Sequence, residues 1–320
     1  MKRYSKNFIL LLSCICMGML LGCNDTNIDK KVNKKYNLGV VLKAMNSEHW
    51  FSVKAGIERA AKDLNVNVTI LYPENETDIE IQKVLIRDMI DNEVDGIAIS
   101  PCDSEDTIEY TTYAQAKKVL VYAIDTEMQT DTYFVGSNNR EIGKMAADYF
   151  INELNFRGEI AVISGSHKQK SHKDRVEGFK DVIDKHDDIK IVYEGIADSS
   201  SIKAMEETEK ILKKYPNISG IFTTNATMAL GIIENESYKN NKNKMKIVCV
   251  DMQSDAIRGV INKKISGIVS QDGYAMGYKT IQNMVKLLKG EDVNKDVYIE
   301  SYIITPENAA DFLNYNQGGS

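Results

Sequence analysis

The sequence has few residues of the kinds that support covalent or metal chemistry. Five of its 320 residues are cysteines, and three of these lie within residues 1–23. The other two, Cys102 and Cys249, each lie in or beside an apolar run, which favours two small buried side chains over a disulfide framework. The four histidines have no metal-ligand spacing, and no G-x-S-x-G, P-loop or G-x-G-x-x-G motif occurs. We therefore expect no enzyme, no cofactor and no metal site.

The sequence also lacks a hydrophobic run of membrane-spanning length. The apolar stretch from Phe8 to Leu21 has about 14 residues, whereas a spanning helix needs about 20. With basic residues before it, this stretch predicts a secretory signal peptide over residues 1–22. Removing that segment changes the net charge from −6 to −9 and leaves no basic stripe, which argues against nucleic acid as a partner.

The signal peptide ends in "LLGC", which resembles a bacterial lipobox. In that motif cleavage occurs before the cysteine, so Cys23 is expected to carry a diacylglycerol. Two acyl chains give stable anchoring. The polar residues that follow, up to position 36, read as a flexible tether. This predicts an extracytoplasmic lipoprotein on the bacterial cell membrane, and an uncleaved membrane anchor is the alternative.

From residue 37 onward, short apolar runs alternate with amphipathic segments. "NLGVVL" (37–42) precedes a helical pattern from Phe51 to Leu64, and "VNVTILY" (66–72) precedes one from Thr77 to Asp91. Further runs of strand length lie at 94–100, 118–124, 159–164, 189–194, 218–224, 245–250 and 265–270. Runs without polar alternation are covered on both faces, and their repetition with helices predicts an α/β fold of parallel sheets.

Two predicted helices each contain a glycine followed by a bulky apolar residue, which hints at an internal repeat. The segments are "KAGIERAAKDL" (54–64) and "VEGFKDVIDKH" (176–186). A glycine in a helix costs roughly 1 kcal/mol relative to alanine, so we expect each helix to pack closely on its sheet. The pattern suggests two similar lobes.

Four apolar runs end in a polar side chain, at Asp125, Asn225, Asp251 and Gln271. Singly, such residues are often helix N-caps. Because parallel strands bring their carboxyl ends to one edge, however, the set predicts a shared site. Glutamine is a poor cap, which favours the second interpretation.

Further candidates come from two other places in the chain. Arg175 lies in "SHKDRVEGF", and "NSEHWF" after the first strand offers Asn46, Trp50 and Phe51. A surface arginine and a core aromatic are the alternatives. Carboxylates, amides and a guanidinium beside aromatic rings suit the hydroxyls and the C–H face of a sugar. Because the set contains charges of both signs, we expect a neutral polyol as ligand.

Jointly these segments resemble the type I periplasmic sugar-binding proteins of ABC transporters, from Asn37 to about Asp311. The likeness rests on "SGIFTTNATMALG", "DRVEGF", "IVCVDMQSDAIRGV" and "GIVSQDGYAMGYKTIQNMVKLLKGE". It implies two Rossmann-like lobes joined by a three-segment hinge, with the ligand between them. The implied lobes are residues 37–136 plus 272–298 and residues 137–271 plus 299–320. The implied sugar-binding residues are Asn46, Trp50, Phe51, Asp125, Arg175, Asn225, Asp251 and Gln271.

Two departures from the family pattern stand out. Thr126 occupies a position where several relatives have Arg, Lys or Asn, so one donor is missing. Ser199 and Ser200 stand where several relatives place a second stacking aromatic. His167 and His172 are expected as solvated loop residues near the mouth of the site, and a direct sugar contact is the alternative.

The resemblance implies a membrane-tethered protein that binds a pentose or hexose by hinge closure and delivers it to an ABC permease. A sensor with the same site, signalling to a membrane histidine kinase or chemoreceptor, is the alternative. A transcriptional repressor with this core needs an N-terminal helix-turn-helix, whereas this chain begins with a signal peptide and lipobox.

Overall fold

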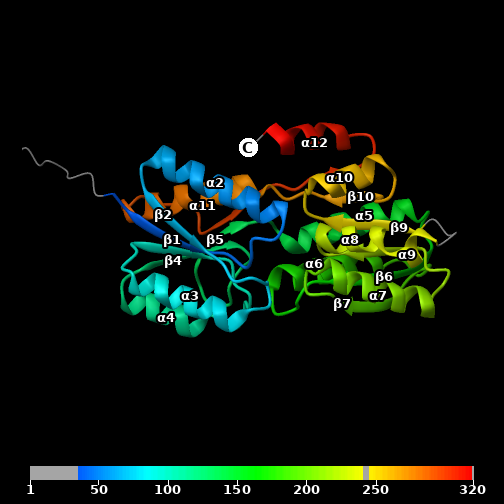
Figure 1. Ribbon diagram of the computed structural model, residues 1–320, viewed down its shortest axis with the longest axis horizontal. Coiled ribbons are helices and arrows are strands. Elements are labelled where there is room, and N and C mark those ends of the chain that lie inside the picture. Colours follow the sequence, from blue (N-terminus) through cyan, green and yellow to red (C-terminus); the bar gives the residue numbers. More distant parts are fainter. Residues whose placement is uncertain (1–34, 241–244, 319–320) are drawn as a thin grey trace, which may run out of the picture. The chain divides into compact units, whose positions relative to one another are not determined.

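The computed structural model describes residues 35–240 and 245–318 (Figure 1). The predicted signal peptide, the predicted lipidation site at Cys23 and nearly all of the tether lie outside these residues. Within the described part of the chain, no helix combines the length and apolarity needed to cross a bilayer.

The first sheet has six strands, all parallel. From edge to edge they are β11 (Asp296–Tyr298), β5 (Tyr133–Gly136), β4 (Leu120–Asp125), β3 (Gly96–Ile99), β1 (Asn37–Val41) and β2 (Asn67–Leu71). Helices α2 (Glu48–Leu64) and α11 (Gly273–Leu288) cover one face, and α3 (Ile79–Asp91) and α4 (Ile108–Ala116) cover the other (Figure 1). We call this sheet with its four helices the first lobe.

The second sheet also has six strands. In order they are β12 (Ile303–Ile304), β10 (Gly267–Val269), β9 (Lys246–Val250), β8 (Gly220–Thr223), β6 (Gly158–Ser164) and β7 (Ile189–Ile196). Only β12, at the edge, is antiparallel to its neighbour among these strands. An antiparallel edge strand is common on an otherwise parallel sheet.

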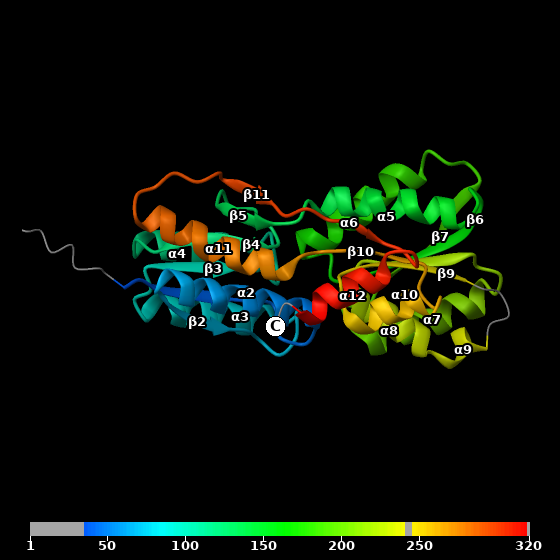
Figure 2. The same cartoon turned by 90° about the horizontal axis from the view of Figure 1, so that it is seen from above.

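Helices cover both faces of the second sheet too. One face carries α5 (Asn139–Glu153) and α6 (Lys170–Ile183); the other carries α7 (Ser201–Lys214), α8 (Ala226–Glu234) and α10 (Ser254–Ile261). The short α9 (Glu236–Lys239) follows α8, and α12 (Ala309–Gly318) packs on α10 (Figure 2). We call this assembly the second lobe.

Each lobe has two apolar cores, one on each face of its sheet. The central strands are buried on both faces: the four residues of β3 and the four of β8 are all buried. This explains why their sequences show no polar alternation. The predicted fold class, two similar lobes with parallel sheets flanked by helices, is confirmed.

Three strands escaped the sequence prediction: β5, β11 and β12. They have only four, three and two residues. Two of them lie at sheet edges. Strands this short carry too few residues to show a periodic pattern.

The helix glycines have a different role from the one expected. A Cβ on Gly56 of α2 would lie 2.1 Å from the Tyr274 carbonyl oxygen of α11, and one on Gly178 of α6 would lie 2.0 Å from the Arg140 carbonyl oxygen of α5. On the other side of the first pair, a Cβ on Gly277 of α11 would lie 2.1 Å from the Val53 carbonyl oxygen of α2. The close packing is therefore between two helices and not between a helix and its sheet. The α2–α11 and α5–α6 pairs are equivalent in the two lobes.

The chain passes between the two sheets three times. It leaves the first sheet after β5, returns between β10 and α11, and leaves again between β11 and β12 (Figure 2). Each sheet is therefore assembled from separate segments of the chain.

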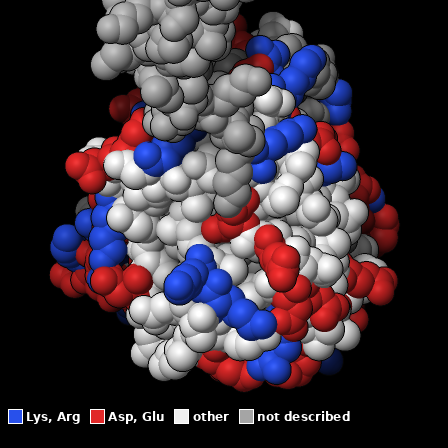
Figure 3. Space-filling view, turned by 90° about the vertical axis from the view of Figure 1, so that its left-hand side faces the viewer, with Lys and Arg blue, Asp and Glu red and all other residues white. Residues whose placement is uncertain are grey.

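The surface carries charges of both signs. Figure 3 views the molecule from the left-hand side of Figure 1, where the first lobe lies, and shows acidic and basic side chains interspersed among uncharged ones. Exposed ion pairs such as Arg59–Asp63, at 2.8 Å, are typical. Cys102 and Cys249 are both buried and unbonded, as predicted, and burial raises the pKa of the Cys102 thiol to about 12.

Candidate functional site

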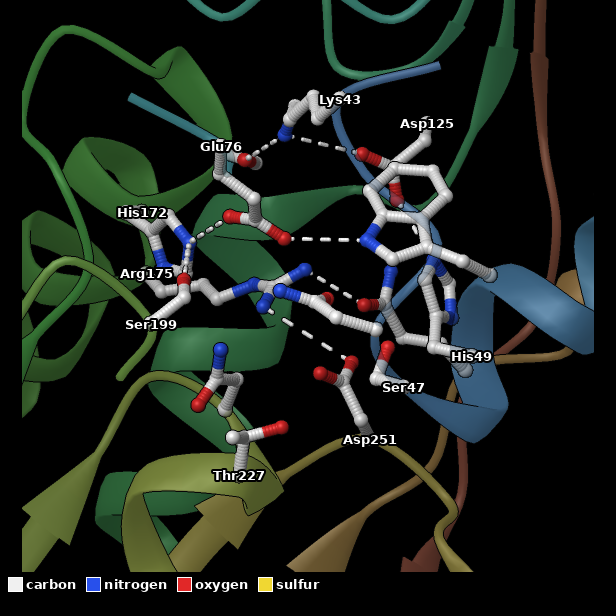
Figure 4. Close-up of a pocket in the computed structure, with 15 residues that line it drawn as sticks. Lys43, Ser47, His49, Glu76, Asp125, His172, Arg175, Ser199, Thr227 and Asp251 are labelled. Carbon is white, nitrogen blue, oxygen red and sulfur yellow. Dashed lines mark hydrogen bonds and ion pairs between the residues drawn. The ribbon is translucent and has the colours of Figure 1, made fainter. Parts of the chain in front are cut away.

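A small polar cavity lies where the carboxyl ends of the two sheets face each other (Figure 4). Its volume is about 20 Å³. Both lobes contribute to its wall, mostly with buried polar side chains. The lining residues are Lys43, Asn46, Ser47, His49, Trp50, Glu76, Asp125, Ser171, His172, Arg175, Ser199, Asn225, Thr227, Asp251 and Gln271.

Asp125 ends β4 and is surrounded by donors from the first lobe. Its two carboxylate oxygens lie 3.2 Å from Lys43 Nζ and 2.9 Å from His49 Nε2. Thr126 Oγ1, at 2.8 Å, and Ser100 Oγ, at 3.3 Å, complete its shell. Although burial opposes ionisation, Lys43 and His49 hold the pKa of Asp125 well below its usual value. Asp125 is therefore a fully partnered carboxylate.

Lys43 supplies the positive charge beside Asp125 that Thr126, the next residue in the chain, does not. It follows β1 and is only 2% exposed. Its ammonium donates to Asp125 and, at 2.6 Å, to Thr126 Oγ1. The missing donor noted at Thr126 is thus replaced by a lysine from a neighbouring strand end, a position to which the resemblance assigned no role.

Asp251 directly follows β9 at the equivalent place in the second lobe, but its carboxylate has far fewer partners. Both aspartates adopt a left-handed backbone conformation, with φ of 66° at Asp125 and 83° at Asp251. Such conformations in non-glycine residues concentrate at functional sites. Asp251 is 7% exposed, and its Oδ1 has no hydrogen-bond partner. Its nearest cation is Arg175, at 3.9 Å.

Arg175 directs its guanidinium mainly to neutral acceptors. It donates to Asn139 Oδ1 at 2.8 Å, to the Thr224 carbonyl oxygen at 2.6 Å and to Gln271 Oε1 at 2.5 Å. The amide nitrogen of Gln271 is left buried without a partner. The guanidinium thus orients Gln271 so that its amide donor remains available.

Asn225 is both a helix cap and a wall residue. Its Oδ1 accepts the backbone N–H of Met228 at 3.0 Å, which caps α8. The same residue lines the cavity. The two interpretations of Asn225 are therefore compatible.

Trp50 and Glu76 form the third part of the wall. Trp50 Nε1 donates to Glu76 Oε1 at 3.0 Å, and both side chains are buried. Glu76 lies in the loop between β2 and α3 and faces His172 of the second lobe, with Nε2 3.9 Å from its Oε2 (Figure 4). Burial opposes ionisation of Glu76, but His172, Lys43 and Trp50 lower its pKa to about 2.

Other contacts hold the two lobes together around the cavity. Ser171 Oγ lies 2.9 Å from Thr126 Oγ1, and Gln169 Nε2 donates to the Glu76 carbonyl oxygen at 3.1 Å. On the rim, three lysines of the second lobe pair with acids of the first. These pairs are Lys168–Asp103 at 3.4 Å, Lys170–Glu127 at 3.0 Å and Lys173–Glu105 at 3.8 Å. The two lobes are therefore in direct contact around the cavity.

The structure brings together seven of the eight candidate residues. The exception is Phe51, which does not line the cavity and is 53% exposed. It follows Trp50 on α2, and adjacent residues of a helix point about 100° apart. Trp50 faces inward, so Phe51 points to solvent.

The expectation of a solvated loop is wrong for His172. This residue belongs to α6, is 4% exposed and lines the cavity, whereas His167 lies in an exposed turn. His172 precedes Arg175 by three residues, so both lie on one helix face. That spacing was a usable signal in the sequence.

Most of the remaining wall was not found from the sequence. The missed residues are Lys43, Ser47, His49, Glu76, Ser171 and Thr227. Ser47 and His49 are next to the candidates Asn46 and Trp50 in the sequence, and this proximity was a weak indication that they line the site. No sequence feature indicated Glu76, because it lies in an irregular loop.

The wall is lined by hydrogen-bonding side chains. No group of three or more His, Cys, Asp or Glu side chains able to hold a metal ion occurs within residues 35–240 and 245–318. Carboxylates, amides, an ammonium and a guanidinium can bind a small polar molecule on all sides.

Comparisons with known proteins agree with this architecture. A family model described as "Periplasmic binding protein domain" matches residues 38–292. The D-allose-binding periplasmic protein of Escherichia coli is 28% identical over 264 residues, covering 79% of this chain and 85% of the relative. The ribose import binding protein RbsB of Bacillus subtilis is 27% identical over 268 residues, covering 82% and 85%.

A solved structure gives the same result. It is a carbohydrate transporter solute binding protein from Agrobacterium radiobacter in complex with D-arabinose, with a TM-score of 0.82 and 26% identity. The match covers 87% of this chain and 96% of that one. These relatives are binding proteins and not enzymes. The chain belongs to the periplasmic binding protein family, in which it resembles the type I sugar-binding proteins of ABC transporters.

Proposed function

We propose that this protein binds a monosaccharide or a similar polyol between its lobes and delivers it to an ABC permease. The relatives named above bind allose and ribose, and one solved structure holds arabinose. The ligand would contact Asn46, Trp50, Asp125, Arg175, Asn225, Asp251 and Gln271, all of which line the cavity.

One observation carries the proposal: two buried polar atoms face the cavity without a partner. Asp251 Oδ1 accepts nothing, and Gln271 Nε2 donates to nothing. An unpaired buried polar group costs about 1–3 kcal/mol, so such groups persist where a ligand satisfies them. A hydroxyl, which donates and accepts, satisfies both kinds of atom.

Binding would require the lobes to separate first. A ligand site of ordinary size occupies about 300–1,000 Å³, whereas the cavity measures about 20 Å³. We place the hinge in the three passages between the sheets, with lobes of residues 37–136 plus 272–298 and 137–271 plus 299–320. The strand membership of the two sheets supports this division. The closed form would be favoured by its greater affinity for the ligand.

The site we propose lies outside the cytoplasm. Family membership supports an extracytoplasmic location. The lipobox-like "LLGC" supports a lipid anchor at Cys23. An import role is favoured over a sensor role because the Bacillus subtilis relative is an import binding protein.

A thermal-shift screen of the purified full-length protein in detergent against pentoses, hexoses and inositols tests the proposal. A bound ligand at 100 times its Kd stabilises by about 2.7 kcal/mol. Trp50 is the only tryptophan of the sequence, so its emission should change with the same ligand. If no member of the panel shifts either the melting temperature or the emission, the proposal fails.

A further inference from the structure

Glu76 is a buried carboxylate that the family resemblance does not account for. It is 9% exposed, and its Oε1 accepts the indole N–H of Trp50. Its Oε2 has one basic neighbour within 4 Å in the described part of the chain, His172 Nε2 at 3.9 Å. That separation is too long for a hydrogen bond. One oxygen of Glu76 is thus available beside the cavity.

His172 contributes no positive charge to this oxygen. Thr224 Oγ1, which accepts the backbone N–H of Gly165 at 3.0 Å, lies 2.8 Å from His172 Nδ1. Ser199 Oγ lies 3.2 Å from His172 Nε2, so both ring nitrogens have a hydroxyl partner that a neutral ring satisfies. Burial, with the charge of Arg175, lowers the pKa of His172 despite the nearby Glu76.

The two permanent cations of the wall make their hydrogen bonds to other acceptors. The ammonium of Lys43 donates to Asp125, Thr126 and, at 3.4 Å, Ser171. The guanidinium of Arg175 donates to Asn139, Thr224 and Gln271. Although burial opposes it, the hydrogen bond to Asp125 raises the pKa of His49, so this ring serves that same carboxylate.

Two carboxylates, one from each lobe, therefore face the cavity without a hydrogen bond from a cation. Asp251 Oδ1 has no hydrogen-bond partner, and its nearest cation, the guanidinium of Arg175, is 3.9 Å away. Buried carboxylates are costly unless they are paired. In a site shielded from water, a cation between two carboxylates gains more than a neutral donor does.

We propose that the preferred ligand is an aminated polyol: a monosaccharide-sized ring that carries a protonated amino group, held by Glu76 on one side of the cavity and Asp251 on the other. This inference rests on the proposed function and narrows its ligand class. It replaces the sequence-based expectation of a neutral ligand, which counted Asp125 and Asp251 against Arg175 but did not include Glu76. Ser199 and His172, in place of a stacking aromatic, make this wall polar.

Matched ligand triplets test the inference by calorimetry on the purified full-length protein in detergent. Each triplet is a neutral sugar or inositol, its amino analogue and the N-acetylated amine, with the amino group placed at each ring carbon in turn. We expect at least one amine to bind tenfold or more tighter than its neutral parent. Acetylation, which removes the charge, should abolish the advantage.

The variant Glu76→Gln assigns the effect to this carboxylate. Its amide oxygen can still accept from Trp50, so the fold is retained, but the preference for the amine should fall at least fivefold. Glu74→Gln, an exposed neighbour in the same loop, is the control and should keep the wild-type preference.

The outcomes separate this inference from the proposed function. A neutral sugar that binds as tightly as every one of its amino analogues overturns the inference and leaves the function standing. Failure of all neutral and aminated members to bind overturns both. A preference for the amine that Glu76→Gln leaves unchanged removes Glu76 from the amine site and overturns the assignment made here.

Discussion

Asp125 and Asp251 occupy equivalent positions in the two lobes, but their surroundings differ. Asp125 is the last residue of β4, Asp251 directly follows β9, and both have a positive φ. Around Asp125, four side chains of its own lobe donate to the carboxylate. Around Asp251, one oxygen has no partner and the nearest cation is 3.9 Å away. Equal backbone positions therefore do not imply equal roles.

The difference indicates where binding energy can come from. A carboxylate whose hydrogen-bond partners are complete gains less from a ligand, so Asp125 should contribute more to the frame of the site than to the affinity. A buried carboxylate oxygen without a hydrogen-bond partner raises the free energy of the folded protein, and a ligand that donates to this oxygen removes that penalty. The second lobe therefore holds the carboxylate that gains most on binding.

The largest expected effect is a contrast between Asp125→Asn and Asp251→Asn. The substitution at position 125 leaves the ammonium of Lys43 buried without its countercharge, which should lower the free energy of unfolding by about 3–5 kcal/mol. The substitution at position 251 removes a carboxylate whose Oδ1 makes no hydrogen bond and should leave stability close to wild type, while the affinity for the ligand should fall by about 2–5 kcal/mol. Asparagine tolerates positive φ at both positions. Urea unfolding and calorimetry measure the two quantities.

The exposed pair Arg59–Asp63 supplies the control, because water screens an exposed ion pair and Asp63→Asn should leave stability close to wild type. If Asp251→Asn destabilised the fold as much as Asp125→Asn, the proposed division between frame and ligand contact would be wrong.

The second prediction concerns a feature that the lobes share. Gly277→Ala and Gly178→Ala each bring a Cβ to about 2 Å from a carbonyl oxygen of the neighbouring helix. Overpacking of this kind costs about 1–3 kcal/mol, offset in part by the better helix propensity of alanine. We expect similar losses in both lobes by thermal or urea unfolding.

Gly259→Ala in α10 is the matched control. Its Cβ would meet the end of the Ile265 side chain at 2.9 Å, and a flexible side chain can move away. A loss in one lobe only would show that the two helix pairs are not equivalent in energy, whatever their geometry.

The smallest expected effect is on the pH dependence of stability, where the two site histidines act in opposite directions. The pKa of His49 is raised above 6.5, because its contacts with Asp125 outweigh the effect of burial. The contribution of His49 is complete below pH 6.5 and is lost as pH rises through the folded-state pKa. The pKa of His172 is lowered by burial, so its contribution is lost as pH falls below 6.5.

Unfolding curves of His49→Gln and His172→Gln over a range of pH measure this difference. In His49→Gln, the decline of the free energy of unfolding above pH 6.5 should disappear. In His172→Gln, the decline below pH 6.5 should disappear. Slopes of the same sign for both histidines would contradict the assigned protonation states.

The sequence predicted polar residues at the ends of buried strands. It missed most of the residues that helix starts and an irregular loop add to the wall. Asp125, Asp251 and Gln271 follow buried strands, and parallel sheets bring such positions to one edge. Glu76 reaches the site from an irregular loop, so no periodic pattern marked it. Phe51 was misplaced because the helix begins at Glu48, three residues before the predicted start, and Trp50 already occupies the inward face.

The discontinuous build of the first lobe also affects the order in which the protein can fold. Helix α11 and strand β11 belong to the first lobe, but they come after most of the second lobe in the chain. During synthesis from the N-terminus, the apolar surface that α11 covers on β4 and β5 stays uncovered until residue 288 has emerged. The nascent first half is therefore the stage most exposed to aggregation, and truncation before α11 would leave that half permanently incomplete.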